Sequence, residues 1–379
     1  MKKKYLLLYV PAGGGHVSTA KGIAKYFQEN YADSVDADVV DGFQWANWLL
    51  YTTVIDGYKK SQTTGQWVYE FIYRANKRWP IAKISQILMS RFLMKDMERI
   101  ILQHKPTNIV ILHFFLIRPM MKVLKKMNIN IPITTIITDP FTIHRMRSLE
   151  KNMQYVVFSE KARDTIIGRD VPAPNVHLYP IVLKEEFSHP LPADKIIELK
   201  KKFDLRLDKK VLLLLWGGDW LPKWAATLEE CIKTNIDAQI LILCGRSKSL
   251  SRQVTKLQKK YPQAPIKAFH GFIDFVYDLI NVSDIIVTKA WPATVMEILF
   301  MNKIPVINSY IREQEKWNVE YVVENKLGFY EPNVKKLVAV VNRMLSWEDD
   351  MSVHYENIKN MHLRNGTQEV AEFLIKNKG

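Results

Sequence analysis

Short apolar runs alternate with helix-like stretches from one end of this 379-residue chain to the other. The runs that predict strands lie at 5–10, 36–41, 107–113, 132–138, 153–158, 211–216, 239–244, 266–270, 284–288 and 305–308. Continuous apolar runs separated by helices are typical of a parallel sheet that is covered by helices on both faces. The pattern therefore predicts an α/β fold.

Two segments interrupt the alternation and indicate two domains. Residues 43–104 form a long insertion that is helical in pattern and carries no strand, whereas 183–195 is charged, contains proline and reads as a linker. A chain of this length is long for one core and comfortable for two. We expect a Rossmann-like doubly wound domain at 1–182 and another at 196–379, facing each other across a ligand-binding cleft. The C-terminal helix would stay in the second domain or pack back on the first.

Composition narrows the class of protein. Hydrophobic residues make up 47% and charged residues 25%, which excludes a disordered or fibrous chain. Two cysteines, Cys231 and Cys244, are too few for a disulfide framework and indicate a reduced, cytoplasmic compartment. No apolar run approaches the roughly 18 residues of a membrane span. The run after the N-terminal lysines ends at Pro11, so it predicts a first strand and not a signal peptide.

The charge balance points to an anionic partner. Lys and Arg number 54 against 39 Asp and Glu, which gives a formal net charge of +15. Residues 1–180 hold 25 basic and 14 acidic side chains, so +11 of this charge belongs to the first half. Such an excess fits nucleic acid, an anionic membrane surface or a phosphorylated ligand.

A glycine-rich turn, VPAGGGHVSTA at 10–20, follows the first predicted strand. Gly13, Gly14 and Gly15 allow close backbone approach, and the helix that follows offers free N–H groups to an anion or a hydroxyl. His16 lies at the carboxyl end of the strand, where a general base would stand. The spacing matches neither the P-loop nor the dinucleotide fingerprint. A tight turn with an incidental histidine remains the alternative.

Two strands of the second half end in related motifs. WGGDW at 216–220 carries Gly217 and Gly218. CGRSKSL at 244–250 carries Arg246, which could bind a phosphate. Alone, the first motif is equally compatible with an ordinary β-α turn, and the second with a solvated surface arginine.

The most informative stretch of the sequence is 266–329. It contains, in order, Gly271 and Phe272, Ser283 and Asp284, Thr288 and Lys289, Thr294 and Glu297, then Gln314, Glu315 and Asn318. This series resembles the donor-binding half of GT-B glycosyltransferases of the monogalactosyldiacylglycerol synthase and processive diacylglycerol glucosyltransferase type, which are related to the peptidoglycan N-acetylglucosaminyltransferase. The glycine-rich turn, TDP at 138–140 with His144, the P-I-V-x4-F run at 180–187, WGGD and CGR also fall in the family's order, so the resemblance covers nearly the whole chain.

The resemblance implies a GT-B enzyme that transfers a hexose, glucose or galactose, with inversion from a UDP-sugar to a membrane-lipid hydroxyl, above all diacylglycerol. It implies that His16 is the catalytic base and that Asp139 assists or orients the acceptor. Alternatives are a transferase for another lipid-linked or soluble acceptor, and a non-catalytic protein of the same fold that binds lipid or nucleotide sugar.

The resemblance also implies a set of donor-binding residues. They are Gly217, Gly218, Arg246, Phe272, Ile273, Lys289, Thr294, Glu297, Gln314 and Glu315. Glu297 would accept the ribose hydroxyls, Gln314 and Glu315 would bind the hexose, and the main chain around Phe272 and Ile273 would bind the uracil edge. The two glycines would let the backbone approach the diphosphate.

This chain departs from the family at the expected diphosphate site. The family's Lys-Pro-Gly-Gly is replaced by residues 289–292, Lys-Ala-Trp-Pro, and its Gly-Gln-Glu by residues 313–315, Glu-Gln-Glu. The glycine pair of the family leaves space for a diphosphate at a helix N-terminus. In this chain the side chain of Trp291 must either fill that space or move out of it. We interpret no carboxylate pattern in the chain as a divalent-ion site, so we expect no metal and no other cofactor, with helix N-termini and basic side chains stabilising the diphosphate.

The insertion 43–104 predicts contact with a membrane. Its nine basic residues against four acidic ones alternate with aromatic residues, and Trp, Tyr, Lys and Arg all favour an anionic lipid interface. The predicted membrane residues are Trp45, Trp48, Trp67, Trp79, Lys59, Lys60, Arg74, Lys77 and Arg78. The alternative is that the aromatic residues pack the helices of the insertion. We therefore expect a peripheral protein on the inner face of the cell membrane, with a UDP-hexose, a lipid acceptor and the anionic membrane surface as partners and no nucleic acid.

Overall fold

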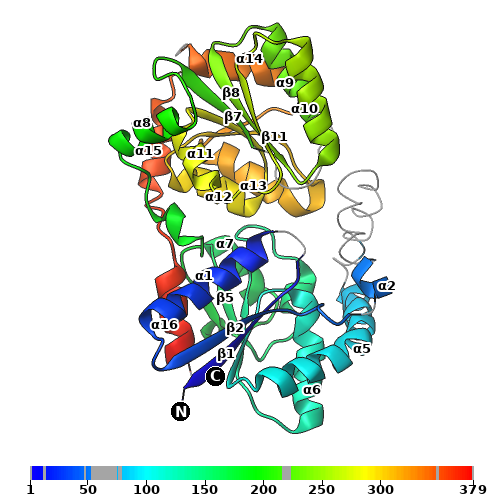
Figure 1. Ribbon diagram of the computed structural model, residues 1–379. Coiled ribbons are helices and arrows are strands. Elements are labelled where there is room, and N and C mark those ends of the chain that lie inside the picture. The colour runs from blue at the N-terminus through cyan, green and yellow to red at the C-terminus, as the bar shows by residue number, and fades with distance from the viewer. Residues whose placement is uncertain are drawn as a thin grey trace. The chain divides into compact units, whose positions relative to one another are not determined.

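The computed structural model describes residues 2–11, 14–46, 48–52, 75, 79–215, 223–346 and 350–377. They form two compact units (Figure 1). The described residues up to Glu185 and the C-terminal segment from Arg364 make up the first unit, and Glu186–Leu363 belongs to the second. Each unit contains one six-stranded sheet in which all neighbouring strands are parallel. The predicted α/β fold is therefore confirmed in both halves of the chain.

The sheet of the first unit has the strand order β2-β1-β3-β4-β5-β6. Its strands are β1 Lys3–Tyr9, β2 Val35–Asp41, β3 Asn108–Ile111, β4 Ile133–Ile136, β5 Gln154–Val157 and β6 Val176–Leu178. In β1, which pairs with a strand on each side, the residues from Tyr5 to Leu8 are fully buried. A strand with helices on both faces has no solvated side, and this explains why its sequence is continuously apolar.

The helices of the first unit cover this sheet. They are α1 Gly14–Asn30, α2 Trp48–Tyr51, α5 Trp79–His104, α6 Ile117–Met127, α7 Glu160–Ile167 and α16 Thr367–Lys376. The buried face of α1 repeats every three or four residues, at His16, Thr19, Ala20, Ile23 and Phe27. This periodicity lays one side of the helix on the sheet and fixes the direction of the His16 side chain.

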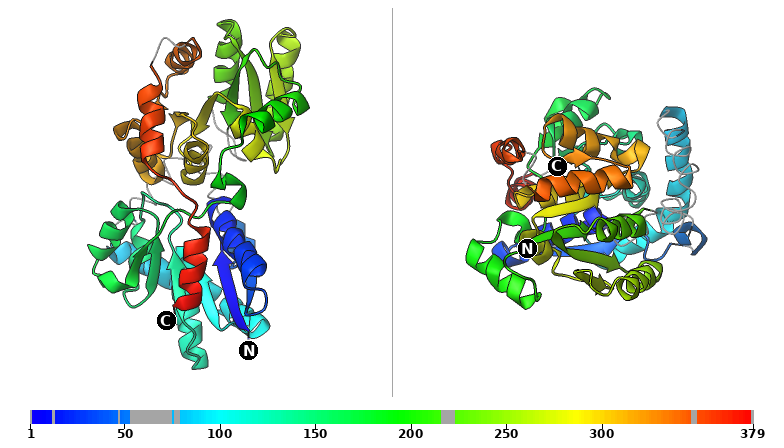
Figure 2. Two further views of the ribbon diagram at one scale, coloured as in Figure 1. Left: turned by 90° about the vertical axis from the view of Figure 1, so that its left-hand side faces the viewer. Right: turned by 90° about the horizontal axis from the view of Figure 1, so that it is seen from above.

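The C-terminal helix α16 packs beside α1 in the first unit (Figure 2). The Tyr5 hydroxyl donates a hydrogen bond to the Leu374 carbonyl at 2.7 Å, and Lys3 Nζ donates to the Ile375 carbonyl at 2.8 Å. Carbonyls in the last turn of a helix have no partner within the helix, so these bonds satisfy them. Both ends of the chain therefore stabilise the same unit.

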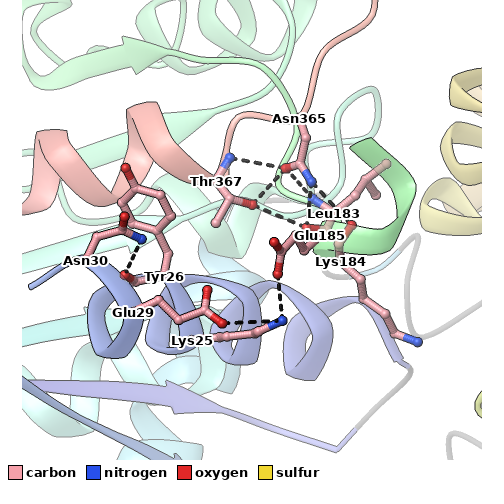
Figure 3. A network of polar contacts seen from close by, with 9 residues as sticks. All are labelled: Lys25, Tyr26, Glu29, Asn30, Leu183, Lys184, Glu185, Asn365 and Thr367. Atoms are coloured by element: carbon pink, nitrogen blue, oxygen red, sulfur yellow. Dashed lines mark hydrogen bonds and ion pairs between the residues drawn. The ribbon is translucent and has the colours of Figure 1, made fainter. Parts of the chain in front are cut away.

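Asn365 holds the returning chain against the segment that leaves the first unit (Figure 3). Its Oδ1 accepts hydrogen bonds from Leu183 N at 3.2 Å, from Thr367 N at 3.1 Å and from the Thr367 hydroxyl at 2.7 Å. Its Nδ2 donates to the Leu183 carbonyl at 3.0 Å and to the Lys184 carbonyl at 3.3 Å. One side chain thus joins two segments that are far apart in the sequence.

The sheet of the second unit has the order β12-β11-β10-β7-β8-β9. Its strands are β7 Lys210–Leu215, β8 Ala238–Gly245, β9 Ile266–His270, β10 Ile285–Lys289, β11 Pro305–Ser309 and β12 Phe329–Tyr330. Its helices are α8 Ala193–Lys202, α9 Trp224–Lys233, α10 Lys248–Lys260, α11 Val276–Val282, α12 Pro292–Phe300, α13 Arg312–Glu324, α14 Val334–Leu345 and α15 Ser352–Asn360.

Each of the ten predicted strands overlaps an observed strand. The two strands that the pattern missed, β6 and β12, have three and two residues and lie at sheet edges. So short a segment shows no periodicity, and its backbone pairing alone defines it as a strand. In the described part of the insertion 43–104 the structure has α2 and α5 and no strand.

The segment predicted as a linker, 183–195, is held at several points. Glu185 accepts a hydrogen bond at 2.6 Å from Lys25 Nζ on α1, in the first unit. The His189 carbonyl accepts one at 2.6 Å from the Tyr277 hydroxyl, in the second unit. Helix α8 then begins before the segment ends. The segment is therefore anchored to both units, although most of its residues are exposed.

Each sheet has one point where the strand order reverses. In the first unit β1 pairs with β2 on one side and β3 on the other, and in the second unit β7 pairs with β8 and β10. The loops that leave the carboxyl ends of such strands diverge to opposite faces, and ligands of open α/β sheets bind between them. The fold thus directs attention to the residues after β1 and β3 and to those after β7 and β10. Residues 216–222, after β7, lie outside the described part of the chain.

Candidate active site

His16 lies in the first turn of α1, at the switch point of the first sheet. Its side chain is buried, with 8% of the residue exposed. Its Nδ1 lies 2.9 Å from the hydroxyl oxygen of Thr138, which follows β4. Gly14 and Gly15 precede His16 in the same turn. The N-terminal end of α1 is uncrowded there, because a Cβ at either glycine would meet nothing within 4 Å. Gly13 lies outside the described residues.

Three further side chains gather near His16 from neighbouring strand ends. His113 follows β3, and its ring meets that of His16 edge-on with 5.1 Å between the centroids. Asp139 follows β4 and forms an ion pair with Arg147, which belongs to the 3-10 turn η3 Arg145–Ser148. The carboxyl ends of parallel strands meet at one edge of a sheet, and this brings residues from four separate segments together.

Burial and the neighbouring charges determine the protonation state of His16. Burial is the main reason why the pKa of His16 falls from its ordinary value of 6.5 to about 4. The positive charge of Arg147 lowers this pKa further, whereas the carboxylate of Asp139 raises it. The imidazole is therefore uncharged at neutral pH and keeps a lone pair that can accept a proton. The cluster can act as a general base.

His113 is a second uncharged imidazole in this cluster. Burial, His16 and Arg147 hold its pKa well below the ordinary value. Its Nδ1 accepts a hydrogen bond from Phe115 N at 3.3 Å, so the ring proton is on Nε2. The ring of Phe114 stacks on that of His113, with 4.5 Å between centroids. The site thus combines an imidazole suited to accept a proton with one that is a hydrogen-bond donor.

The sequence motifs supplied part of this cluster. His16 and Asp139, which the resemblance named, both lie in it, and their catalytic roles stay predictions. His113, Thr138 and Arg147 were missed as site residues. His113 ends a predicted strand, and the rule that ligands bind at strand carboxyl ends could have found it. Arg147 gave no signal in the sequence, because it lies in an irregular segment whose path only the fold determines.

A buried ion pair occupies the switch point of the second sheet. Lys289, the last residue of β10, places its Nζ 3.2 Å from Glu315 Oε1, and the two side chains are 2% and 1% exposed. The other carboxylate oxygen of Glu315 accepts a hydrogen bond from Ile311 N at 2.7 Å. Asn318 Nδ2 donates to the Ala290 carbonyl at 2.8 Å. The predicted donor-binding roles of Lys289 and Glu315 would require a ligand to reach groups that the protein already surrounds, and they stay predictions.

Trp291, the main departure from the family pattern, lies next to this ion pair. Its ring lies 4.4 Å from the Lys289 ammonium group, a favourable cation–π distance. It is the N-cap of α12 without forming a side-chain cap, and Pro292 is the first residue of that helix. Thr294 and Glu297 follow on α12, both partly accessible and three residues apart, so they lie on one face of the helix. That face is accessible to the predicted ribose contact.

Other predicted donor residues lie at the ends of β8 and β9. The Arg246 guanidinium is 5.4 Å from the centre of the Phe272 ring, which is 73% exposed. Ile273, after β9, and Gln314, on α13, are partly exposed. Gly217 and Gly218 lie outside the described residues. The structure thus brings together Lys289 with Glu315 and Arg246 with Phe272, and places Thr294 with Glu297 on one helix.

The predicted membrane residues are only partly described. Trp48 and Trp45 are 74% and 37% exposed and line a surface groove together with Phe92, Lys95, Asp96 and Arg99. Trp67, Lys59, Lys60, Arg74, Lys77 and Arg78 lie outside the described residues, as does the side chain of Trp79, where α5 begins.

Helix α5 carries an exposed apolar stripe that sequence reasoning did not single out. The stripe consists of Ile81, Ile84, Leu88 and Phe92, which are exposed. The basic residues Lys83, Arg91, Lys95 and Arg99 of the same helix are exposed as well. The opposite face packs in the core through Leu93, Met97 and Ile100. Among the described residues, no helix is both long enough and apolar enough to cross a membrane.

Comparison with known proteins agrees with the resemblance found in the motifs. A probable chloroplastic monogalactosyldiacylglycerol synthase of Nicotiana tabacum is 24% identical over 94% of this chain and 67% of its own length. A processive diacylglycerol beta-glucosyltransferase of Bacillus pumilus is 24% identical over 99% of this chain and 95% of its own length.

Solved structures of low sequence identity share the fold. A glycosyltransferase from Rickettsia africae superposes with a TM-score of 0.60 at 15% identity, with 100% of both chains covered. HepE from Anabaena, solved with UDP-glucose, has a TM-score of 0.58 at 11% identity, with 98% of both chains covered. The fold is therefore GT-B, as predicted. The stretch 16–183, which holds the whole His16 cluster, matches the family described as monogalactosyldiacylglycerol (MGDG) synthase.

Proposed function

We propose that this protein is an inverting glycosyltransferase that moves a hexose from a UDP-sugar to a hydroxyl of a membrane lipid, above all diacylglycerol. The observation that carries the proposal is the buried, uncharged imidazole of His16 at the switch point of the first sheet, within the segment that matches the family. The names of the two similar proteins support a glycolipid product, and the UDP-glucose bound to HepE supports the donor class.

The proposed reaction needs one base and a stabilised leaving group. The lipid hydroxyl oxygen attacks the anomeric carbon on the face opposite the UDP, and the new C–O bond forms as the bond to the diphosphate breaks. The bonding electron pair leaves with UDP, and the hydroxyl proton passes to His16. Because burial keeps this imidazole uncharged at neutral pH, it is ready to accept the proton before the acceptor binds.

On the donor side we expect the protein to stabilise the diphosphate without a metal. Arg246, at the end of β8, is exposed and could lie near the diphosphate, while Glu297 on α12 would accept the ribose hydroxyls. Main-chain N–H groups at helix N-termini would supply the remaining positive potential. Trp291 then limits the space beside the diphosphate and is expected to influence which hexose is accepted.

His16→Ala tests the function directly. Transfer of hexose to diacylglycerol in vesicles, read by the mass of the lipid product, should fall by roughly 10²–10⁴-fold, the usual contribution of a general base. UDP affinity measured by calorimetry should not change, since the donor contacts belong to the second unit. His189→Ala, at an exposed histidine, is the matched control. Wild-type transfer by His16→Ala would show that the base is another residue.

A second candidate function follows from the ring of Trp291 over Lys289. If this arrangement blocks the productive donor position, the protein binds lipid or nucleotide sugar without catalysis. UDP binding by the wild type without transfer to any lipid would favour this alternative. No UDP binding at all would contradict the proposed transferase.

We further propose that the protein lies on the inner face of the membrane with the α5 stripe against the lipid. Apolar side chains flanked by Lys and Arg bind anionic interfaces through both burial and charge. Phe92→Asp should weaken co-sedimentation with anionic vesicles, whereas Leu207→Asp, at an apolar residue that is 52% exposed in the second unit, should not. Binding that ignores Phe92→Asp, anionic lipid content and ionic strength would contradict this surface.

A further inference from the structure

Asp139 is neutralised by a buried arginine that no motif predicted. The side chains of Arg147 and Asp139 are 8% and 15% exposed and form an ion pair. The Nε of Arg147 has no hydrogen-bond partner within the described residues. The position of the guanidinium thus leaves one of its buried N–H donors unsatisfied. Removing two charges from water is unfavourable before their mutual attraction is counted, and apolar residues often stabilise a core as well or better. Stability alone therefore gives little reason for an ion pair at this position.

We propose that Arg147 is a positioning residue of the candidate active site, which fixes the Asp139 carboxylate and, through the adjoining Thr138, the imidazole of His16. The geometry is continuous along this path. Arg147 holds Asp139, the next residue toward the N-terminus is Thr138, and the Thr138 hydroxyl oxygen lies 2.9 Å from His16 Nδ1. In this arrangement Asp139 orients and does not itself take the proton.

Arg147 also contributes the positive charge that offsets the Asp139 carboxylate. The charged and titratable groups that face His16 are Arg147 from η3, Asp139 from the loop after β4 and His113 after β3. The Asp139 carboxylate by itself raises the pKa of His16 and so favours its imidazolium form. Arg147 opposes this effect at His16, and its charge also lowers the pKa of His113.

A purely structural role explains Arg147 less well, because another arginine already holds the loop of residues 143–148 in place. Arg169 on the neighbouring segment donates hydrogen bonds to the Ile143 carbonyl at 2.8 Å, to the His144 carbonyl at 3.3 Å and to the Ser148 hydroxyl at 3.1 Å. The path of residues 143–148 is thus fixed from outside the site. Arg147 is left to act on Asp139.

The decisive experiment is a titration of His16 in the full-length protein without substrate, by NMR of labelled histidine with His16→Gln to assign the signal. In Arg147→Met the unpaired Asp139 should raise the pKa of His16 from about 4 by roughly one unit or more. In Asp139→Asn the remaining cation should leave this pKa at about 4 or lower it. Arg147→Lys keeps the charge and should restore a low pKa at least in part.

Arg118→Met is the matched control. Arg118 faces Glu150 at 3.5 Å in the same unit, both side chains being 24% exposed, and neither is among the groups that shift His16. The pKa of His16 should not change in this variant. An unchanged His16 pKa in Arg147→Met overturns the proposal. A rise in Asp139→Asn as large as in Arg147→Met overturns it as well, because a general loosening of the site would move the His16 pKa toward its ordinary value in both variants. If Arg147→Met does not fold, Arg147→Gln, which also removes the charge, takes its place with the same expected rise.

The consequence for catalysis rests on the proposed function and has its own readout. The acid limb of the transfer rate should move to higher pH in Arg147→Met, and the loss at acid pH should lie in kcat and not in the KM for the UDP-sugar. If the wild type transfers no hexose, the proposed function fails, while the titration of His16 still decides the role of Arg147. If transfer occurs and the acid limb does not move in Arg147→Met, the positioning role is wrong.

Discussion

The buried pair of Lys289 and Glu315 allows a sharp stability prediction. The two side chains are 2% and 1% exposed, so neither charge gains solvation if its partner is lost. Glu315→Gln keeps an oxygen that can accept the hydrogen bond from Ile311 N, and it removes only the negative charge. Breaking a buried ion pair on one side typically costs about 3–5 kcal/mol. For a unit of this size that corresponds to a fall in Tm of about 6–20 °C.

Calorimetric unfolding at neutral pH is the appropriate assay, because it can separate the transitions of the two units. The transition of the second unit should move, and that of the first should not. The double variant Lys289→Met with Glu315→Gln leaves no buried charge at this position and should recover much of the loss. Glu372→Gln, which breaks an exposed pair with Lys376, should change little.

Two results would refute this reasoning. A fall in Tm of less than about 2 °C in Glu315→Gln would mean that the Lys289 ammonium group loses its charge or reaches water at little cost. A double variant as unstable as Glu315→Gln alone would mean that the loss comes from packing and not from an unpaired charge. Either result would also reopen the question of whether a ligand can reach Lys289.

Three further outcomes follow from the structure. His16 has a pKa of about 4 in the folded protein and 6.5 ordinarily, so the unfolded chain binds the proton more readily. About 3 kcal/mol of the free energy of unfolding should therefore be lost as pH falls from 6.5 toward 4. Urea unfolding midpoints at pH 7 and pH 4.5 measure this loss, which should be smaller in His16→Gln. Asn365→Ala removes the three hydrogen bonds that join this side chain to Leu183 and Lys184, so hydrogen exchange of α16 should accelerate by one or more orders of magnitude. Asn360→Ala, at an exposed residue, should leave it unchanged. EDTA should not reduce hexose transfer, and a loss that Mg²⁺ or Mn²⁺ restores would show that the diphosphate needs a metal.

Most of the fold could be predicted from the sequence because strands in a parallel sheet have a local signature. A strand such as β1, with Tyr5 to Leu8 fully buried, is recognisable from its own residues, since both of its faces are apolar. The switch-point motifs are local too, because the glycine-rich turn and His16 follow β1 directly. The strands β6 and β12 were missed, as they are too short to show a pattern.

The candidate site was only half predictable, and the reason is the same in both units. His16 and Asp139 stand in motifs, but the guanidinium of Arg147 pairs with Asp139 only because η3 turns back toward the end of β4. Glu315 was predicted to bind a sugar from its motif, yet its carboxylate is engaged by Lys289 and Ile311 N. A motif gives the type and order of residues and says nothing about how deeply each side chain is buried.

The sequence by itself therefore determined the α/β class, the positions of ten strands and the turn that carries His16, because these depend on residues close together in the chain. Only the tertiary structure decided that Arg147 accompanies Asp139, that Lys289 and Glu315 are sealed together, and that α16 returns to the first unit. Ion pairing and burial depend on distances in space between residues that are far apart in sequence, and these distances are fixed only when the whole core packs.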